Sequence, residues 1–451
     1  LKAAVLKRIK PGSAEEKRVG AFAAKLGVIA KKVSRKEIAF CGSIGKSTWL
    51  SGDHDIDMFI LFPKSVSREE LEKNGLLYGK KIAKAMKGRH IIKYAEHPYV
   101  QAIIGGFNID IVPCYKIEKG EGIKSAVDRS PLHLEYILAK LKPELMDEVR
   151  LLKQFCKGVG VYGSDTKNLG FSGYICELLI LNSRSFENVL TDAAKWKAPH
   201  LIDVEHHSGD VNIKDVFSDQ PLLMIDPVDP KRNVAANLSS ENFVRFVEAA
   251  KAFLAKPDMD YFFPPEMKQL NSKENSVLNK RGTRFIAIKF NKPDIIDDVL
   301  YPQLRRAIKR IETLLRHNEF IVIRSFEYAD TDAILVFELE VWSLPNVKKM
   351  VGPPIFSHKH SKEFLSKYKK TFIEGIKWAA ERDREFITAS QLLNSLIKMK
   401  PGEMIKNGIP GHIAKEMTKS ELIEEKFFDL VKKNKKFSAF LRKRYFYSLS
   451  L

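Results

Sequence analysis

Two aspartates separated by one residue stand at the start of a strongly apolar run. Asp55 and Asp57 open the segment Asp-Ile-Asp-Met-Phe-Ile-Leu-Phe, which precedes Pro63. Residues two apart on a strand face the same side, roughly 6.5 to 7 Å apart, so the two carboxylates project together. They repel each other and are costly to keep ionised unless a cation lies between them. Such a pair suits Mg²⁺, which one or two carboxylates hold together with substrate phosphates.

A third acid interrupts another apolar strand pattern. Asp110 lies in Asn108-Ile-Asp-Ile-Val, and a neighbouring strand would bring its carboxylate beside the other two. Three acids can hold two metal ions, one activating an attacking hydroxyl and one stabilising leaving pyrophosphate. Upstream, Gly42 and Ser43 lack bulk, so backbone N–H groups can approach phosphates. The combination predicts metal-dependent nucleotidyl transfer, whereas an isolated D-x-D pair would fit a solvated acidic turn.

A competing motif overlaps this segment. Gly45-Lys46-Ser47 resembles the end of a P-loop, G-x-x-x-x-G-K-[ST]. The first glycine of that motif would fall at position 40, which is Phe40. A P-loop also runs directly into a helix, whereas here Ser51-Gly-Asp predicts a turn and a strand follows. The sequence therefore disfavours a P-loop ATPase.

The elements that must position these residues alternate between helical and strand patterns. The expected elements before residue 142 are a helix at 14–33, a strand from Ile38, a strand at 56–62, a helix at 67–86 and strands at 99–104 and 107–112. From 143 to about 256 the apolar spacing is helical. Residues 283–290, 297–316, 320–326 and 333–342 then give strand, long helix, strand and strand, an order that fits a ferredoxin-like split βαβ module.

The resulting fold class is α+β and multidomain. We predict a catalytic head at 1–142, a helical neck at 143–256, a ferredoxin-like body at 257–350 that meets RNA, and a mostly helical, lysine-rich tail at 351–451.

The composition of the chain indicates what kind of partner it binds and in which cellular compartment it is expected. Lys and Arg number 76 against 56 Asp and Glu, a net charge of +20, which favours a polyanion bound through its phosphates. No apolar run reaches the roughly 18 to 20 residues of a membrane span, and the first residues are too often lysine for a secretory signal. The four cysteines form no C-x-x-C pair, so we expect reduced core residues and a cytoplasmic protein without membrane contact.

Several longer strings resemble one family, the class I or archaeal CCA-adding enzymes, which are tRNA nucleotidyltransferases of the polymerase β superfamily. The Gly-Ser and D-x-D signature belongs to the whole superfamily and does not separate this family from poly(A) polymerases. The strings that resemble the archaeal enzymes specifically lie at 89–100, 110–115, 124–131, 148–153, 161–163, 170–179 and 226–239.

This resemblance implies a polymerase β-like head and the addition of C, C and A to the 3′ end of tRNA from CTP and ATP. It implies that Mg²⁺ binds Asp55, Asp57 and Asp110. It also implies a second set of residues, which bind the nucleotide: Gly42, Ser43, Lys46, His133, Lys153, Tyr162 and Arg232. Arg232 would address the base and the basic tail would grip the acceptor and T stem.

Several of these nucleotide-binding residues can also be explained without a functional role. Lys46 stands where the family commonly has arginine, and lysine meets phosphate as a point charge without a bidentate fork. Taken alone, Lys153 would be a solvated residue on a helix face, Tyr162 a core aromatic, His133 a packing or capping residue and Arg232 a loop cation.

Two other functions stay open at this point. A poly(A) or other RNA-terminal nucleotidyltransferase shares the metal site but would not stop after three additions. A catalytically silent RNA-binding protein could share the fold, although the intact set of three acids argues against it. The sequence does not fix whether both nucleotides are used or what ends addition, and it leaves a homodimer open.

Overall fold

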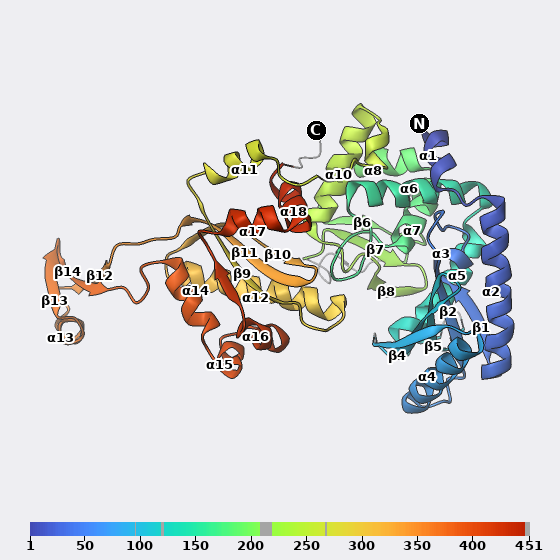
Figure 1. The fold of residues 1–451 in the computed structure, drawn as a ribbon, viewed down its shortest axis with the longest axis horizontal. Helices are drawn as coiled ribbons and strands as arrows, with labels where there is room; N and C mark the ends of the chain where they lie inside the picture. The colour runs from blue at the N-terminus through green and yellow to red at the C-terminus, as the bar shows by residue number, and fades with distance from the viewer. Residues whose placement is uncertain (95, 119–120, 208–218, 267, 447–451) are drawn as a thin grey trace. The chain divides into compact units, whose positions relative to one another are not determined.

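The computed structural model describes residues 1–94, 96–118, 121–207, 219–266 and 268–446. The chain divides into two compact units, Leu1–Pro265 and Glu266–Ser448 (Figure 1). Among the described residues, no helix combines the length and the apolar character needed to span a membrane.

Unit 1 begins with a five-stranded sheet whose strand order is β1-β2-β5-β4-β3. β2 and β5 are parallel, and the other neighbouring strands are antiparallel. Ile56, Met58 and Ile60 pack with helices α2 and α4 on one face of the sheet. Because strand residues alternate between faces, Asp55 and Asp57 lie on the opposite face.

The sequence analysis predicted α2, β1, β2, α4, β4 and β5, although β1 begins one residue before Ile38, and it did not predict α1, α3, β3 or α5. Their bounds are α1 (Lys2–Ile9), α2 (Ser13–Ser34), β1 (Glu37–Cys41), α3 (Gly42–Gly45), β2 (Asp55–Phe62), α4 (Arg68–Ala85), β3 (Arg89–Tyr94), β4 (Pro98–Ile104), β5 (Phe107–Tyr115) and α5 (Arg129–Lys140).

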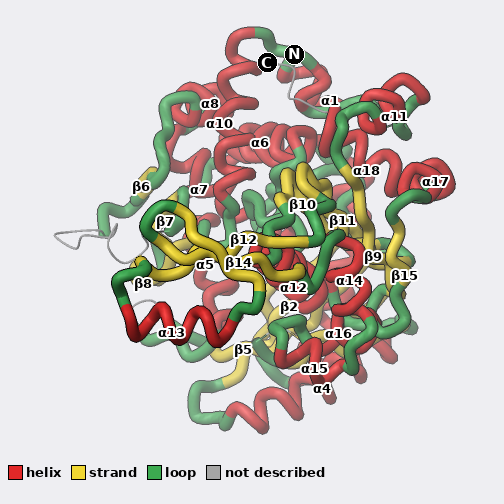
Figure 2. The backbone as a smooth tube through the Cα atoms, turned by 90° about the vertical axis from the view of Figure 1, so that its left-hand side faces the viewer, coloured by secondary structure: helices red, strands yellow, loops and turns green. Residues whose placement is uncertain are grey.

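The second part of unit 1 is mainly helical, as predicted, and its helices α6, α7, α8 and α10 lie together in both views (Figures 1 and 2). A small sheet of order β6-β7-β8, which the sequence analysis did not anticipate, is inserted among them. The bounds are α6 (Met146–Val159), α7 (Gly173–Ser183), α8 (Phe186–Ala193), β6 (His200–Ile202), β7 (Leu222–Asp226), β8 (Asp229–Asn233) and α10 (Ser240–Ala255).

Unit 2 contains the predicted split βαβ module in the sheet β10-β11-β9-β15. The order is that of a ferredoxin-like sheet, and β15, from the segment predicted as tail, supplies its last strand. The bounds are α11 (Ser272–Asn279), β9 (Arg284–Asn291), α12 (Asp297–His317), β10 (Ile321–Ala329), β11 (Asp332–Val341) and β15 (Glu421–Ile423).

Both faces of this sheet are covered. Helices α12, α14 and α16 pack on one face, and α11, α17 and α18 pack on the other through an aromatic cluster that includes Phe285, Phe427 and Phe437. Neither face of this four-stranded sheet is therefore open, and the predicted contact of the body with RNA stays a prediction.

The segment after residue 342 is mostly helical, as predicted, but it begins with a separate sheet of order β12-β14-β13. That sheet and α13 form the part drawn at the left of Figure 1. The bounds are β12 (Val347–Pro354), α13 (His358–Lys367), β13 (Lys370–Glu374), β14 (Lys377–Asp383), α14 (Ala389–Ile397), α15 (Pro401–Lys406), α16 (Gly411–Met417), α17 (Phe427–Lys433) and α18 (Lys435–Phe446).

Candidate active site

The three predicted acids meet at the junction of β2 and β5. In the parallel register Asp57 lies opposite Asp110, and Asp55 lies opposite Asn108. Asn108 donates a hydrogen bond of 2.9 Å to Asp55, and Gln101 donates one of 2.8 Å to Asp110. The predicted convergence of Asp55, Asp57 and Asp110 on one face of the sheet is therefore what the structure shows.

Burial and neighbouring carboxylates raise the pKa values of Asp57 and Asp110. Burial, followed by the charges of Asp110 and Asp55, raises the pKa of Asp57 to about 6, and Lys46 opposes this rise. Burial also raises the pKa of Asp110, against the hydrogen bond from Gln101. The repulsion among these carboxylates would favour a cation bound between them.

The acids fit a metal site that the substrate completes. Among the residues that the structure describes, no three His, Cys, Asp or Glu side chains are placed so that they could hold an ion by themselves. Mg²⁺ does not require such a cage, since it retains waters and takes one or two carboxylates plus substrate phosphates. Asp57 and Asp110 on adjacent strands, with Asp55 beside them, offer that partial set of oxygen ligands.

The short helix α3 begins directly beside Asp57. Cys41 pairs with Asp57 across β1 and β2, and Gly42 follows it with φ of +63°. A Cβ at Gly42 would lie 1.9 Å from the Oδ2 atom of Asp57, so only glycine fits this close approach. Ser43 is the next residue of the turn. The turn thus brings backbone N–H groups next to the acids, as the Gly-Ser pattern predicted.

Lys46 and Lys153 share one buried carboxylate. Lys46 Nζ lies 2.8 Å from Glu177 Oε2, and Lys153 Nζ lies 3.1 Å from Glu177 Oε1. Thr48 donates a hydrogen bond of 2.7 Å to the same Oε1 atom. Burial alone would raise the pKa of Glu177, but the two lysines outweigh it and lower that pKa to about 2. We call Lys46, Thr48, Lys153 and Glu177 the Glu177 cluster.

This cluster corrects the simpler reading of Lys153. The residue is 2% exposed rather than solvated, and burial lowers its pKa although Glu177 opposes that effect. Arg150, one turn earlier on α6, donates a hydrogen bond of 3.0 Å to the carbonyl oxygen of Trp49. Helices α6 and α7 therefore hold the loop after Lys46. The sequence analysis assigned no role to Glu177, although an acid within the apolar run of α7 was a usable signal.

Tyr162 lies next to this cluster. A Cβ at Gly173 would be 3.1 Å from the Tyr162 hydroxyl and 3.3 Å from Lys153 Cε, which places both side chains against the start of α7. The ammonium of Lys157 lies 5.4 Å from the centre of the Tyr162 ring. Burial raises the pKa of Tyr162, so its hydroxyl stays protonated and can donate. Lys153 and Tyr162, which were predicted as neighbours at the nucleotide, are neighbours in the structure.

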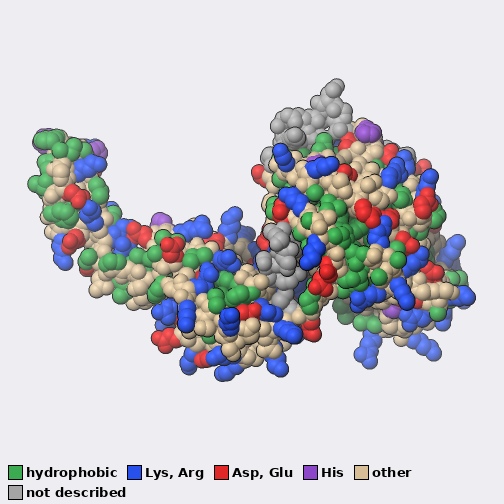
Figure 3. Space-filling model, turned by 90° about the horizontal axis from the view of Figure 1, so that it is seen from above, with side chains coloured by type: hydrophobic (Ala, Val, Ile, Leu, Met, Phe, Trp, Pro, Cys, Tyr) green, Lys and Arg blue, Asp and Glu red, His purple; other side chains and the backbone are tan. Residues whose placement is uncertain are grey.

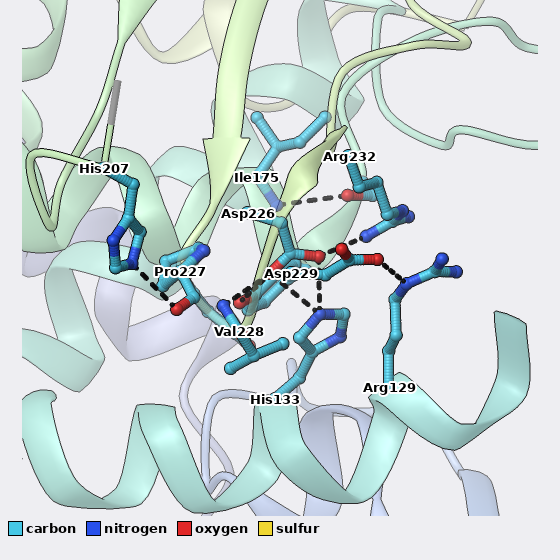
Figure 4. Close-up of polar contacts among 12 residues, drawn as sticks. Arg129, His133, Ile175, His207, Asp226, Pro227, Val228, Asp229 and Arg232 are labelled. Carbon is cyan, nitrogen blue, oxygen red and sulfur yellow. Dashed lines mark hydrogen bonds and ion pairs between the residues drawn. The ribbon is translucent and has the colours of Figure 1, made fainter. Parts of the chain in front are cut away.

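His133 and Arg232 meet at a second buried acid, Asp226. Arg232 donates to Asp226 over 2.7 Å, and His133 Nε2 lies 2.9 Å from the same carboxylate (Figure 4). Burial opposes ionisation of Asp226, but these two partners keep its pKa below the ordinary value. Tyr174 stacks on His133 with ring centres 3.9 Å apart, and Lys46 Nζ is 4.8 Å from the Tyr174 ring. Tyr174 therefore links this group to the Glu177 cluster.

A large cavity lies beside the Asp226 group. Its volume is about 1570 Å³, and its lining includes Arg129, His133, Tyr136, Tyr174 and Arg232. The three acids of β2 and β5 are not among the lining residues. Asp226 itself was missed because the β6–β8 sheet was not predicted.

The comparisons with known proteins cover most of the chain. Residues 26–133 match the model of a nucleotidyltransferase domain, residues 147–263 that of the tRNA nucleotidyltransferase second domain, and residues 281–423 that of the CCA-adding enzyme C-terminal domain. The CCA-adding enzyme of Methanosarcina acetivorans is 40% identical over 91% of this chain and 92% of its own. Those of Methanocaldococcus jannaschii and Archaeoglobus fulgidus are each 40% identical, over 84% and 80% of both chains respectively. Since these matches extend over most of the chain, the chain belongs to the family of the CCA-adding enzymes.

Proposed function

We propose that this protein adds C, C and A to the 3′ end of tRNA from CTP and ATP, with release of pyrophosphate and without a nucleic-acid template. The observation that carries the proposal is the placement of Asp57 opposite Asp110, beside the Gly42–Ser43 turn. Carboxylates that bind metal ions, next to backbone N–H groups that bind phosphate, fit a reaction in which a hydroxyl attacks the α-phosphate of a nucleotide. The same reaction serves the maturation and the repair of tRNA ends.

Two Mg²⁺ ions would supply activation of the attacking hydroxyl and stabilisation of the leaving pyrophosphate. Asp55, Asp57 and Asp110 would hold them. Asp110 accepts from Gln101 through Oδ1, which orients its carboxylate. The raised pKa of Asp57 reflects uncompensated negative charge, which a bound cation would stabilise.

The triphosphate would lie over the Gly42–Ser43 turn. Ser43 offers a hydroxyl there, and Lys46, with Lys153 and Tyr162, would meet the phosphates and the sugar. In the structure both lysines are bound to Glu177, so part of their charge is already compensated. When a nucleotide binds, its phosphates would therefore replace or share the contacts that the two lysines make with Glu177.

Arg232 and His133 would address the base and sugar from the Asp226 side. Arg232 is held in place by Asp226, and its side chain is 35% exposed. Its guanidinium can therefore present remaining donors to the base edge while one stays fixed. The RNA end would complete this pocket and admit C twice and then A.

The rest of the tRNA would be held by shape and phosphate, along its acceptor and T stem. Figure 3 shows lysine and arginine side chains over much of the visible surface, with acids among them. Binding of this kind carries no sequence information, which suits an enzyme that must accept every tRNA.

The test uses tRNA transcripts that end before CCA, after C or after CC, with labelled CTP or ATP and Mg²⁺. Ordered addition of C, C and A that is absent from the Asp57→Ala variant supports the proposal. Unlimited addition of A would instead indicate a poly(A) polymerase. Tight binding of tRNA without any extension would leave only an RNA-binding function.

A further inference from the structure

The acids of the head sheet lie between two different surfaces. On one side, β1 ends in the Gly42–Ser43 turn, where the triphosphate is proposed to lie. On the other side, β4 and β3 continue the sheet to its edge. In an in-line displacement the attacking oxygen and the leaving oxygen are on opposite sides of the phosphorus. If pyrophosphate leaves on the β1 side, the attacking RNA end must arrive from the β4 and β3 side.

The strand registers show which side chains of β4 and β3 lie on the same face of the sheet as the acids. The row through Asp57 and Asp110 continues to Gln101 on β4 and Ile91 on β3. Directly opposite residues of paired strands share a face, so all four side chains lie on one face of the sheet.

The neighbouring row gives the same result. It runs from Asp55 and Asn108 to Ile103 on β4 and Arg89 on β3. Tyr99 and Lys93 form the next pair along β4 and β3. The face that carries the catalytic acids therefore continues across Arg89, Ile91, Lys93, Tyr99, Gln101 and Ile103, which we call the β3–β4 face.

The β3–β4 face is open and has the chemistry of a nucleic-acid contact. Ile91 is 57% exposed and Ile103 is 58% exposed, unusual for aliphatic residues in the middle of strands. Arg89 is exposed beside them. Lys93 is close enough to lower the pKa of Asp110. With strands about 4.8 Å apart, β3 lies roughly 10 Å beyond Asp110, a reach suited to one or two nucleotides.

We propose that the β3–β4 face holds the unpaired 3′-terminal nucleotides of the RNA substrate and aims the 3′-hydroxyl at the acids. The isoleucines contact the bases without reading their edges, and Arg89 and Lys93 bind the phosphates between them. This proposal rests on the proposed function and adds to it where the RNA end lies and which residues hold it.

The charge and the position of the face favour RNA over a second copy of the chain. An edge strand with exposed aliphatic residues can also pair with another edge. However, a symmetric strand pair would bring Arg89 and Lys93 of the two copies close together, where their like charges repel, whereas they complement phosphates. The face is also continuous with the acids, and a partner chain seated there would block the approach to them.

The experiment measures binding of two RNA hairpins to the full-length protein, one with two unpaired 3′ nucleotides and one with none. The variants are Arg89→Ala and the pair Ile91→Ala with Ile103→Ala. We expect each to weaken binding of the hairpin with unpaired nucleotides at least fivefold and to leave the other hairpin within twofold. In extension assays the KM for RNA should rise similarly while the KM for CTP stays within twofold.

The matched controls are His90→Ala and Ile92→Ala, because these residues alternate with Arg89 and Ile91 and point to the opposite face of β3. They should leave binding of both hairpins and the KM for RNA within twofold. Equal losses in control and test variants would overturn the proposal, and so would unchanged binding in the test variants. A change of oligomeric state at unchanged RNA affinity would assign the face to a dimer contact and would also overturn it. Failure of the wild-type protein to extend any RNA would instead refute the proposed function.

Discussion

Two buried carboxylates of unit 1 have pKa values shifted in opposite directions. Asp57 has its pKa raised to about 6, whereas Glu177 has its pKa lowered to about 2. Burial alone would raise both. Glu177 is bound by two lysines that the protein supplies, while Asp57 faces two more carboxylates. The negative charge of Glu177 is thus compensated within the folded protein, whereas that of Asp57 would be compensated only by bound metal ions and substrate.

The comparison also assigns separate tasks to the two regions. The Glu177 cluster fixes the loop after Lys46 against α6 and α7, so it contributes mainly to stability and to positioning. The acids of β2 and β5 cost stability in the free protein and would serve the proposed reaction. Four measurements test this contrast.

The largest effect is expected for Asp57→Asn. Loss of one carboxylate of a metal-dependent site should lower kcat by at least about 10³-fold, because the cations would lose a ligand that neutral amides replace poorly. The variant should remain folded, since the substitution removes repulsion among three acids. Single-turnover addition of CMP, with urea unfolding alongside, checks both points. Activity within tenfold of wild type would show that Asp57 does not hold the metal.

Glu177→Gln should have the largest effect on stability. It leaves Lys46 and Lys153 buried without their carboxylate, and breaking a buried ion pair in this way costs about 3–5 kcal/mol. Urea denaturation of the two proteins measures the loss. Thr48→Val serves as the control because it removes the hydrogen bond that Thr48 donates to Glu177 and the one that it accepts from Lys153, but neither charge, so its cost should be only about 1–2 kcal/mol. Equal losses in the two variants would contradict a role based on charge.

Gly42→Ala tests the contact between the turn and Asp57. The added methyl group would collide with the Asp57 carboxylate and would also occupy a left-handed backbone conformation. Displacement of a ligand by about 1 Å can reduce the rate about 10²-fold, and we expect that loss in kcat. Gly52→Ala is the matched control, since Gly52 also has positive φ but has open space around its Cβ position. Similar losses in both variants would attribute the effect to backbone strain alone.

The smallest effect is a difference in pH dependence. Because the folded-state pKa of Asp57 is raised above its unfolded value near 3.8, the folded protein binds that proton more tightly, and the associated stability is lost as pH rises through about 6. Without divalent cations, Asp57→Asn should therefore be more stable than wild type by roughly 3 kcal/mol at pH 8. At pH 4, close to the unfolded-state pKa, the difference should fall below about 1 kcal/mol.

Glu177 should show the opposite sign. Its pKa is lowered, so its contribution is present above about pH 4.5 and is lost as pH falls towards 2. Urea unfolding of wild type, Asp57→Asn and Glu177→Gln across pH 2.5 to 8 in EDTA compares the two. A stabilisation by Asp57→Asn that does not change with pH would contradict the assigned cause.

Local patterns predicted the parts of the site that short segments specify. The D-x-D pair and the acid within Asn108-Ile-Asp-Ile-Val each lie on one strand, and apolar strands of this kind pair side by side. The helix and three strands from β9 to β11 were likewise visible because each is long and regular.

Other features depended on pairings that no local pattern contains. Glu177 contacts Lys46, which is 131 residues away in the sequence, and Lys153, which is 24 residues away. Each residue by itself suits an ordinary helix or loop. β6 and β15 have three residues each, too few for a periodic signal. Asp226 was missed for the same reason, since β7 and β8 lie within a region whose apolar spacing is otherwise helical.

The position of β15 has a consequence for biosynthesis. The ferredoxin-like sheet takes its last strand, and the aromatic cover of one face, from residues after 420. While a ribosome is still making those residues, the β9 edge and the apolar side chains beneath α17 and α18 have nothing to pair with, a state prone to aggregation. Translation that stalls before Glu421 would thus yield a chain with a complete unit 1 but an unfinished unit 2, which chaperones and proteases would recognise by its exposed edge.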